Sequence, residues 1–479
     1  LLHDADARSE MGGRGRSIIR KSFTWPRFMS EFLAILGEDY GYSPASEPKV
    51  SVIVPNYRHA PYLEERLRTV FEQTVRPHEI IFLDDCSPDD SVAVARRLAP
   101  ESPVPMRIVV NEENSGSTFK QWMKGMALAT GDLIWLAESD DSCDPRFLER
   151  LVPEFRDPEV ALAYSQSALI GPEGELWAAD FLGHTDDIDP ERWRSRYTAD
   201  AAEEAEIGLS QKNTIPNASA AVFRKPAAMD FAEELAGMRF AGDWLFYAML
   251  LRGGKIAFVP ESLNSYRRHE ATVSFQSTKA DTHAEETLHA KFRVFETYDV
   301  SLNAMARGLG QTLFEYDLLT ERFALKRPSL MNNARAAGPL NKIRGLMRRK
   351  LAAPGELRIL LVVDGSEADL EAIATAHLAN ALAREHAVFV CCTRPSRAAE
   401  RLRELFDDRV VLLEGTFDVT PWSAEPAGDL PANRVRTTVL QEMVRFHEID
   451  AIHSRGEAAD RLVAHINVDL NVPWFIHLA

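Results

Sequence analysis

Short apolar segments alternate with amphipathic ones over the first half of the chain. Helical spacing of apolar residues is found in PYLEERLRTVFEQT, DDSVAVARRLA and TFKQWMKGMALAT. Around and between these lie strand-like runs, namely VSVIVPNY, EIIFLDD, MRIVVN, DLIWLAE and ALAYSQ. Strands that alternate with helices of this length predict βαβ units and a mostly parallel, doubly wound α/β sheet. Because these strands are apolar on both faces, we expect helices to cover both sides of the sheet.

The pattern changes twice further along. Helical spacing prevails over residues 276–350 and ends in the basic run NKIRGLMRRK, which predicts a helical region followed by a linker. From Glu356 on, apolar runs again alternate with helical segments, in LRILLVV, AVFVCC, RVVLL and AIHS. This second alternation predicts a further, Rossmann-like α/β unit.

These changes predict four parts. We expect an N-terminal extension over residues 1–47, an α/β domain over 48–275, a helical region and linker over 276–355, and a second α/β unit over 356–479. At ~150 residues per domain, 479 residues suffice for about three domains. The sequence has no initiator Met and stops inside an expected strand, so we expect it to belong to a longer protein.

Composition and charge narrow the choice of partners. With 55 Lys and Arg against 72 Asp and Glu, the net charge is −17, which disfavours binding to nucleic acid or to an anionic lipid surface. No run reaches the ~18 apolar residues of a membrane-spanning helix, and the first residues do not form a signal peptide. The 4 cysteines show no disulfide or zinc pattern, so we expect a reducing, cytoplasmic compartment.

Carboxylates gather where expected strands end. Glu138, Asp140 and Asp141 follow one buried strand, and Asp84 and Asp85 follow another. In a doubly wound sheet, ligands bind beyond the carboxyl ends of the strands. Neighbouring carboxylates repel one another unless a divalent cation lies between them, and oxygen ligands suit Mg²⁺ or Mn²⁺. The alternative is a solvated turn whose Asp residues cap the next helix.

A third group of polar residues lies further along. Asp243 follows Gly242 at the start of an apolar helix, where an N-cap is the ordinary explanation. Arg267, Arg268 and His269 follow a strand-like segment. Such a triplet is usually a solvated edge, but two guanidinium groups and an imidazole also suit a diphosphate.

In this order and spacing, the motifs resemble the inverting nucleotide-sugar glycosyltransferases of family two, which have the GT-A fold. The resemblance covers about residues 48–275. It rests on VSVIVPNYRHAPYLEERLRTVFEQT, EIIFLDDCSPDDS, NEENSGSTFKQWMKGMALATGDLIWLAESDD, NTIPNASAAVFRK, AGDWLFYAMLLRGG and SLNSYRRHEATVS.

The resemblance implies an activity and a setting. A sugar would pass from a nucleoside-diphosphate donor, with a UDP-sugar favoured, to a hydroxyl of a glycan or lipid-linked acceptor, with inversion. The implied pathway is bacterial surface-polysaccharide synthesis. It would take place in the cytoplasm or at the inner membrane face, where the basic run 342–350 is a candidate contact.

The resemblance also implies a nucleotide site. Pro55, Asn56 and Tyr57 would line the nucleotide pocket. Asp85 would accept a hydrogen bond from the base ring, with Asp84 on the ribose side.

Basic residues would lie near the phosphates of the donor. Lys120 matches a position where the family often has a basic residue, although a solvated helix face is the alternative. Arg267 and Arg268 would bind the diphosphate.

The family's DxD-type element is matched by Glu138, Asp140 and Asp141. The resemblance implies that Asp141 contacts a divalent metal ion and that Asp140 contacts the metal or the ribose. Glu138 replaces a more usual Asp, which leaves a structural role open. His269 matches a position that completes the metal or phosphate shell in some relatives. Asp243 matches the general base, and such a base contributes ~10²–10⁴ in rate.

Residues 356–479 resemble the amino-terminal half of a GT-B glycosyltransferase of the family-four type, in LRILLVVDGSEADLEAIATAHLANALAREHAVFV and IDAIHSRGEAADRLVAHINVDLNVPWFIHLA. The family's Gly-rich turn after the first strand is replaced by DGSEADLEA. Such enzymes bind the donor mostly with their carboxyl-terminal half, so we expect this unit to be inactive by itself. A scaffold or docking domain is the alternative.

Two other functions are compatible with the fold. A sugar-1-phosphate nucleotidyltransferase would begin with a Gly-rich, basic loop, whereas VIVPNYRHAPYL contains none. A catalytically silent nucleotide-sugar or carbohydrate-binding module would be expected to lack the acids of ESDD or Asp243, and all of these are present.

Overall fold

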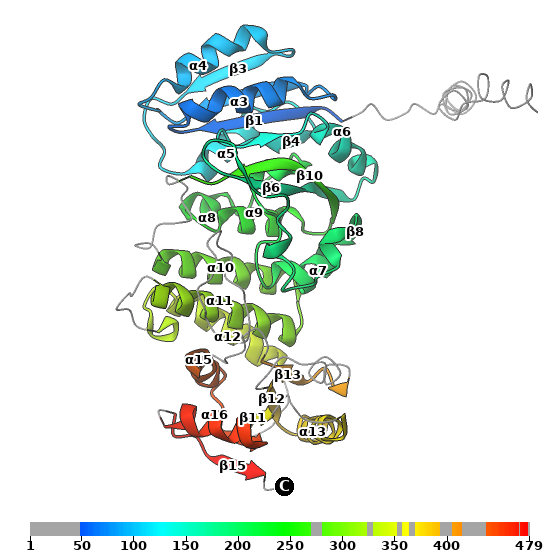
Figure 1. The fold of residues 1–479 in the computed structure, drawn as a ribbon, viewed down its shortest axis with the longest axis vertical. Helices are drawn as coiled ribbons and strands as arrows, with labels where there is room; N and C mark the ends of the chain where they lie inside the picture. The colour runs from blue at the N-terminus through cyan, green and yellow to red at the C-terminus, as the bar shows by residue number, and fades with distance from the viewer. Residues whose placement is uncertain are drawn as a thin grey trace, which may run out of the picture. The chain divides into compact units, whose positions relative to one another are not determined.

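The computed structural model describes residues 48–269, 280–322, 329–351, 357–363, 369–392, 405–413, 437–468 and 470–477. The expected N-terminal extension, residues 1–47, lies outside the described residues. The described chain forms two β-sheets with their helices, and a group of long helices contacts both parts (Figure 1).

The first sheet has ten strands. In chain order they are β1 (Val50–Asn56), β2 (Glu79–Asp84), β3 (Met106–Val110), β4 (Leu133–Leu136), β5 (Ser142–Cys143), β6 (Val160–Ile170), β7 (Leu176–Ala178), β8 (Tyr197–Asp200), β9 (Ala221–Arg224) and β10 (Lys255–Arg267). The spatial order is β3-β2-β1-β4-β9-β6-β10-β5, with β7 paired to β6 and β8 paired to β10.

The sheet is parallel where the sequence alternation is clearest. Strands β3, β2, β1 and β4 pair in parallel, as the apolar runs and their helical connections predict. Strand β9 pairs antiparallel to both β4 and β6, whereas β6 and β10 are parallel. The result is a mixed α/β sheet. The short strand β9 was not among the predicted strands, and its direction depends on its pairing with β4 and β6.

Helices cover both faces of the parallel part, as predicted. The helices of this domain are α3 (Ala60–Phe71), α4 (Ser91–Leu98), α5 (Thr118–Leu128), α6 (Phe147–Leu151), α7 (Ala201–Glu204), α8 (Ala232–Gly237) and α9 (Gly242–Leu250). Ile53 joins Phe119 of α5 in one apolar cluster, and Val54 joins Leu67 of α3 in another. Successive strand side chains therefore serve opposite faces.

Three long helices follow the first sheet: α10 (Ala280–Tyr298), α11 (Leu302–Arg322) and α12 (Ala337–Lys350). Helix α10 packs against α9, and α11 packs against a helix of the second sheet, α15 (Thr437–His447), as Figure 1 shows. Leu288, Leu309 and Ile343 are buried in the same apolar cluster as Leu245 of α9. The long helices therefore share the core of the first domain.

The second sheet is parallel throughout. Its spatial order is β13-β12-β11-β14-β15. The strands are β11 (Arg358–Val363), β12 (Ala387–Cys392), β13 (Val410–Leu412), β14 (Ala451–Arg455) and β15 (Trp474–His477), and two more helices are α13 (Asp369–Leu382) and α16 (Glu457–Asn467). Parallel strands with helical connections agree with the second sequence alternation.

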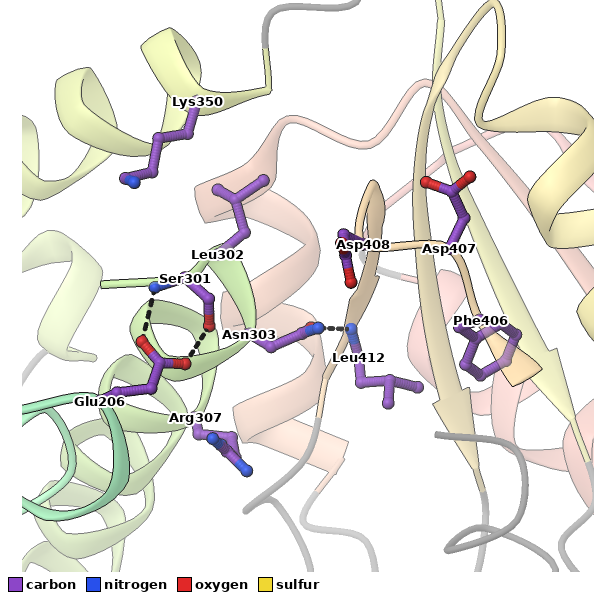
Figure 2. Close-up of a pocket in the computed structure, with 10 residues that line it drawn as sticks. All are labelled: Glu206, Ser301, Leu302, Asn303, Arg307, Lys350, Phe406, Asp407, Asp408 and Leu412. Atoms are coloured by element: carbon purple, nitrogen blue, oxygen red, sulfur yellow. Dashed lines mark hydrogen bonds between the residues drawn. The ribbon is translucent and has the colours of Figure 1, made fainter. Parts of the chain in front are cut away.

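A cavity of about 680 Å³ lies between the start of α11 and β13 (Figure 2). On one side Glu206 accepts hydrogen bonds from the backbone N–H and hydroxyl of Ser301. On the other, Asn303 Oδ1 accepts from the Leu412 N–H at 2.8 Å. These hydrogen bonds tie α11 to both α/β parts.

The basic run that ends α12 contacts the chain itself. Arg348 forms an ion pair with Glu448, and Lys350 forms one with Asp299. Among the described residues, no helix combines the length and the apolar character needed to cross a membrane.

Candidate active site

The ends of β1 and β2 bring two predicted nucleotide residues together. Asn56 pairs with Asp84 in the parallel register. Asn56 Nδ2 donates to Asp84 Oδ1 at 2.8 Å, and the Ser87 N–H donates to Asp84 Oδ2 at 2.8 Å. Asn56 and Asp84 are both buried. Tyr57, the next predicted residue, is exposed.

Asp85 is buried and organises the loop between β3 and α5. Its Oδ1 accepts from Asn111 Nδ2 at 2.6 Å, the Ser115 N–H at 2.9 Å and Gln121 Nε2 at 2.8 Å, and its Oδ2 accepts from Ser115 Oγ at 2.8 Å. The role of Asp85 toward a base ring stays a prediction. The sequence analysis did not single out Gln121, which lies within a helical pattern.

A cavity of about 630 Å³ opens beside this loop. It is lined by Val110, Asn111, Glu112, Glu113, Asn114, Ser115, Lys120 and Lys124. Lys120 Nζ donates to the Ser115 carbonyl at 3.3 Å. The structure thus places the predicted Lys120 beside the Asp85 loop, with a polar cavity in front of it.

Glu138 is directed toward the protein interior. Its Oε1 accepts from Trp122 Nε1 at 2.7 Å. Burial, followed by the nearby Asp140 carboxylate, raises the pKa of Glu138 to about 8. This carboxyl group is therefore hydrogen-bonded within the core around Trp122.

Asp141 and Arg267 link the acidic segment to the end of β10. Asp141 Oδ1 accepts from the Arg267 backbone N–H at 2.9 Å. The Arg267 side chain is buried and donates to the Asp140 and Gly171 carbonyls and to Glu65 Oε2. Burial and the Asp140 charge raise the pKa of Asp141 to about 7. Both side chains thus form hydrogen bonds within the protein. The roles of Asp141 toward a metal ion and of Arg267 toward a diphosphate stay predictions.

Arg268 is the second predicted diphosphate ligand. It is partly buried, and its guanidinium lies over the ring of Tyr266, 4.8 Å from the centroid. Its role toward a diphosphate also stays a prediction.

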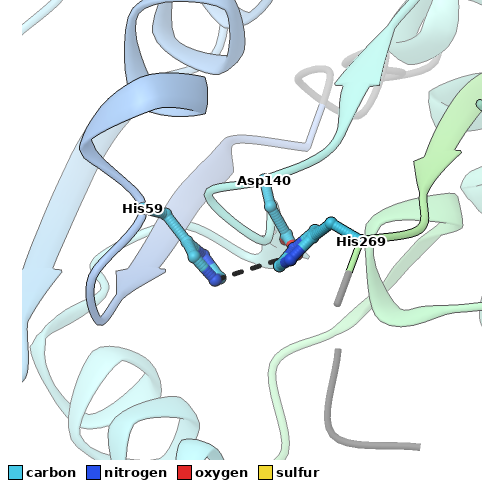
Figure 3. Close-up of side chains that lie close together, drawn as sticks. All are labelled: His59, Asp140 and His269. Carbon is cyan, nitrogen blue, oxygen red and sulfur yellow. Dashed lines mark hydrogen bonds and ion pairs between the residues drawn. The ribbon is translucent and has the colours of Figure 1, made fainter. Parts of the chain in front are cut away.

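Asp140 lies between two imidazoles (Figure 3). Its Oδ2 is 3.1 Å from His269 Nε2 and 3.9 Å from His59 Nε2. The potential ligand atoms of the three residues all lie within 4.8 Å of one another. Burial opposes ionisation of Asp140, but the two imidazoles lower its pKa.

This cluster has the composition of a metal site. Two imidazole nitrogens and a carboxylate are ligands for divalent transition metals. His59 Nδ1 lies 2.9 Å from Ser139 Oγ, a hydrogen bond of the kind that orients a histidine ligand. The sequence analysis found Asp140 and His269 but missed His59, because a single histidine between β1 and α3 matches no spacing rule.

Asp243 is the second residue of α9 and is partly exposed. Its Oδ1 accepts from the Trp244 N–H at 2.8 Å, and its Oδ2 accepts from Asn213 Nδ2 at 3.0 Å. Desolvation is the largest influence and raises the pKa of Asp243 to about 6. A carboxylate with this pKa suits proton transfer near neutral pH. Asn213, on a loop, was not predicted.

The Tyr266 phenol is affected both by the acidic segment, Asp140 and Asp141, and by Asp243. Burial raises the pKa of Tyr266 to about 12, and the charges of Asp141, Asp140 and Asp243 also raise it. All three carboxylates therefore act on the same side chain of β10.

Comparison with known proteins finds a family similar to the first α/β domain. Residues 51–228 match the family model Glycosyl transferase family 2. These residues are therefore similar to the glycosyltransferases of family 2. The mixed α/β sheet agrees with the GT-A fold that this similarity implies.

Several proteins are similar to parts of this chain. An uncharacterised protein of Mycobacterium tuberculosis is 27% identical over 48% of this chain and 69% of its own length. An uncharacterised glycosyltransferase of Nostoc is 33% identical over 23% of this chain and 34% of its own length. Chondroitin synthase of Pasteurella multocida is 27% identical over 27% of this chain and 13% of its own. The chain thus spans much less than two thirds of most of these relatives.

Among solved structures, this chain is similar to residues 1–349 of S. aureus TarS, and the alignment covers 63% of this chain and 82% of the TarS chain. The identity is 16% and the TM-score is 0.45.

Proposed function

We propose that this chain is a metal-dependent, inverting glycosyltransferase. It would move a sugar from a nucleoside-diphosphate donor, with UDP favoured, to a hydroxyl of a glycan or lipid-linked acceptor. The observation that supports this most is the cluster of Asp140, His59 and His269, of which Asp140 and His59 lie in the part that matches glycosyltransferase family 2.

The proposed cation ligands are His59, Asp140 and His269. We propose Asp140 rather than Asp141 as the carboxylate ligand, because Asp141 already accepts a hydrogen bond from the backbone of β10. When bound, a divalent cation neutralises charge on a leaving diphosphate. Mg²⁺ prefers oxygen ligands, so two imidazoles favour Mn²⁺ of the two expected ions.

The proposed nucleotide site lies at the ends of β1 and β2. Asn56 and Asp84 are held together there, and Lys120 faces the cavity beside the Asp85 loop. In this arrangement the base and ribose lie at the strand ends and the diphosphate lies toward Asp140.

The proposed reaction is a single displacement. Asp243 accepts the proton of the acceptor hydroxyl while that oxygen bonds to the anomeric carbon. The bond from the anomeric carbon to the phosphate oxygen breaks at the same time, and its electron pair leaves with the nucleoside diphosphate. One displacement inverts the anomeric carbon.

The remaining parts are proposed as follows. Residues 356–479 form the amino-terminal half of a GT-B-like domain that is inactive by itself, with a scaffold role as the alternative. The parallel five-stranded sheet supports this proposal.

We also propose that the protein acts at the cytoplasmic side of a bacterial membrane, in surface-polysaccharide synthesis.

A transfer assay with a panel of nucleotide sugars and Mn²⁺ tests the proposal. Asp243→Asn should lower kcat by ~10²–10⁴-fold, because a positioned base is lost. Asp230 is exposed and forms an ion pair with Arg252, so Asp230→Asn is the matched control and should keep the wild-type rate.

The pH dependence of the wild-type protein is a second test. Its kcat should fall as pH drops through about 6, because Asp243 must be ionised to accept a proton.

Three outcomes separate the candidate functions. Wild-type kcat in Asp243→Asn would remove the proposed base. Donor binding without turnover in every variant would indicate a silent binding module. Release of pyrophosphate from a nucleoside triphosphate and a sugar 1-phosphate would indicate a nucleotidyltransferase.

A further inference from the structure

A carboxylate from α10 binds the turn that leads into Asp243. Both oxygens of Glu286 lie 3.0 Å from the Arg239 backbone nitrogen. Glu286 Oε2 also accepts from the Phe240 N–H at 2.7 Å and from the Ala241 N–H at 3.1 Å. The side chain is only 8% exposed. Three consecutive backbone N–H groups therefore converge on one buried carboxylate.

This contact anchors the turn that precedes α9. Its three N–H donors belong to residues 239–241, and the first residue of α9 is Gly242. Ala241, at the N-cap of α9, makes no side-chain capping bond. A negative charge beside the start of a helix is favourable toward the helix dipole. Glu286 thus brings an acceptor and a charge from a different helix to the segment that ends two residues before Asp243.

We propose that Glu286 is a positioning residue for Asp243, so that α10 forms part of the active site. This inference rests on the proposed function of Asp243 as the base. Helix α10, like Asp243 on α9, lies outside residues 51–228, the part matched by the family model. The helical region would then serve catalysis as well as packing.

Further contacts hold α10 along the length of α9. Tyr298 Oη donates to the Ala248 carbonyl. Lys291 Nζ lies 5.5 Å from the ring centroid of Trp244, the residue after Asp243. Because α10 contacts the turn before α9, Trp244 in its first turn and Ala248 toward its end, a shift of α10 would move the Asp243 carboxylate.

Glu286 also adds negative charge near Asp243. Burial raises the pKa of Asp243 most, hydrogen bonds from Trp244 and Asn213 lower it, and the Glu286 carboxylate raises it. Other titratable groups near this region are the phenols of Tyr247 on α9 and Tyr266 on β10, the imidazole of His184, which bonds to the Asn213 carbonyl, and two groups of α10, the His283 imidazole and the Lys291 amine. Removal of the Glu286 charge should therefore shift the pKa of Asp243 downward.

The test compares Glu286→Gln with Glu285→Gln in the full chain. Glu285 is the neighbouring acid on α10, and its side chain is 39% exposed. Glu286→Gln should lower kcat at least about tenfold, because small displacements of a catalytic group reduce rates steeply. The KM for the donor should stay the same, and the acidic limb of the kcat–pH profile should move to lower pH. Glu285→Gln should match the wild type in all three.

Two further measurements separate positioning from general stability. Backbone hydrogen exchange over residues 239–244 should be faster in Glu286→Gln and unchanged in Glu285→Gln. In an Asp243→Asn background, Glu286→Gln should cause no further loss of rate. If Glu286→Gln does not fold, Glu286→Asp takes its place: it keeps the charge but is one methylene shorter, so it should lower kcat without moving the acidic limb.

Each contrary result has a distinct meaning. Wild-type kcat and pH profile in Glu286→Gln, with Asp243→Asn inactive, would overturn the positioning role alone. An equal loss of rate in the wild-type and Asp243→Asn backgrounds would also overturn it, because the effect would not act through Asp243. Full activity of Asp243→Asn would instead refute the proposed function.

Discussion

At the residue scale, the structure adds His59 to the residues predicted from the sequence. Its imidazole lies 5.5 Å from that of His269, centroid to centroid, with the planes nearly perpendicular. Both rings direct a nitrogen toward Asp140 (Figure 3). A metal ion at this point would have one ligand from each of three separate chain segments.

His59→Gln should therefore weaken Mn²⁺ binding at least about tenfold, because one nitrogen ligand is lost while side-chain size is nearly kept. Mn²⁺ titration followed by electron paramagnetic resonance measures this directly, without an activity assay. His78→Gln, at an exposed histidine, serves as the control. Equal Mn²⁺ affinity in both variants would place the ion elsewhere.

At the element scale, α11 approaches the first domain through a glycine. A Cβ atom at Gly308 would lie 2.0 Å from the Ser210 carbonyl oxygen. The Gly308 carbonyl itself accepts a hydrogen bond from the buried Lys291. The backbones of α11 and the Ser210 turn thus pass too close together for any larger residue.

Gly308→Ala should destabilise the chain by ~1–3 kcal/mol, because overpacking forces backbone shifts. Gly338→Ala on α12 is the matched control, since a Cβ there meets nothing within 4 Å. It should be neutral or stabilising by up to ~1 kcal/mol, as alanine favours helix. Thermal unfolding measures both, and a Tm for Gly308→Ala at or above that of Gly338→Ala would contradict the close approach.

At the scale of the whole molecule, one apolar cluster joins both sheets through the long helices. It contains Ile53 of β1, Ile343 of α12 and Phe389 of β12. Polar contacts follow the same path: Glu442 Oε2 accepts from the Met331 N–H at 3.1 Å, and Arg344 Nε donates to the Phe446 carbonyl at 3.1 Å. Shared packing of this kind favours cooperative unfolding.

Calorimetry of the full chain should therefore give a single transition. Mn²⁺ with UDP should raise its Tm, since a ligand at 100 times its Kd stabilises the native state by ~2.7 kcal/mol. UDP with a chelator should raise it less. Two transitions, of which only one responds to the ligands, would show that the second sheet unfolds independently.

The sequence by itself determined the features that arise from local patterns. The alternation of apolar runs with helical segments predicted the parallel strands β3, β2, β1 and β4 and the helices on both faces, because strand and helix periods differ. The acids at strand ends singled out Asp84 and Asp140, and the acid at a helix start singled out Asp243, although their roles stay predictions. These features depend on neighbours in the chain, so they can be read from short windows.

Only the tertiary structure decided which distant residues meet. His59 and His269 come together across Asp140, and Glu286 binds the turn before Asp243, through contacts between segments that are far apart in sequence. The antiparallel direction of β9 and the packing of α10 on α9 also depend on long-range contacts. Such contacts follow from how whole elements pack, and neither residue type nor periodicity at one position carries that information.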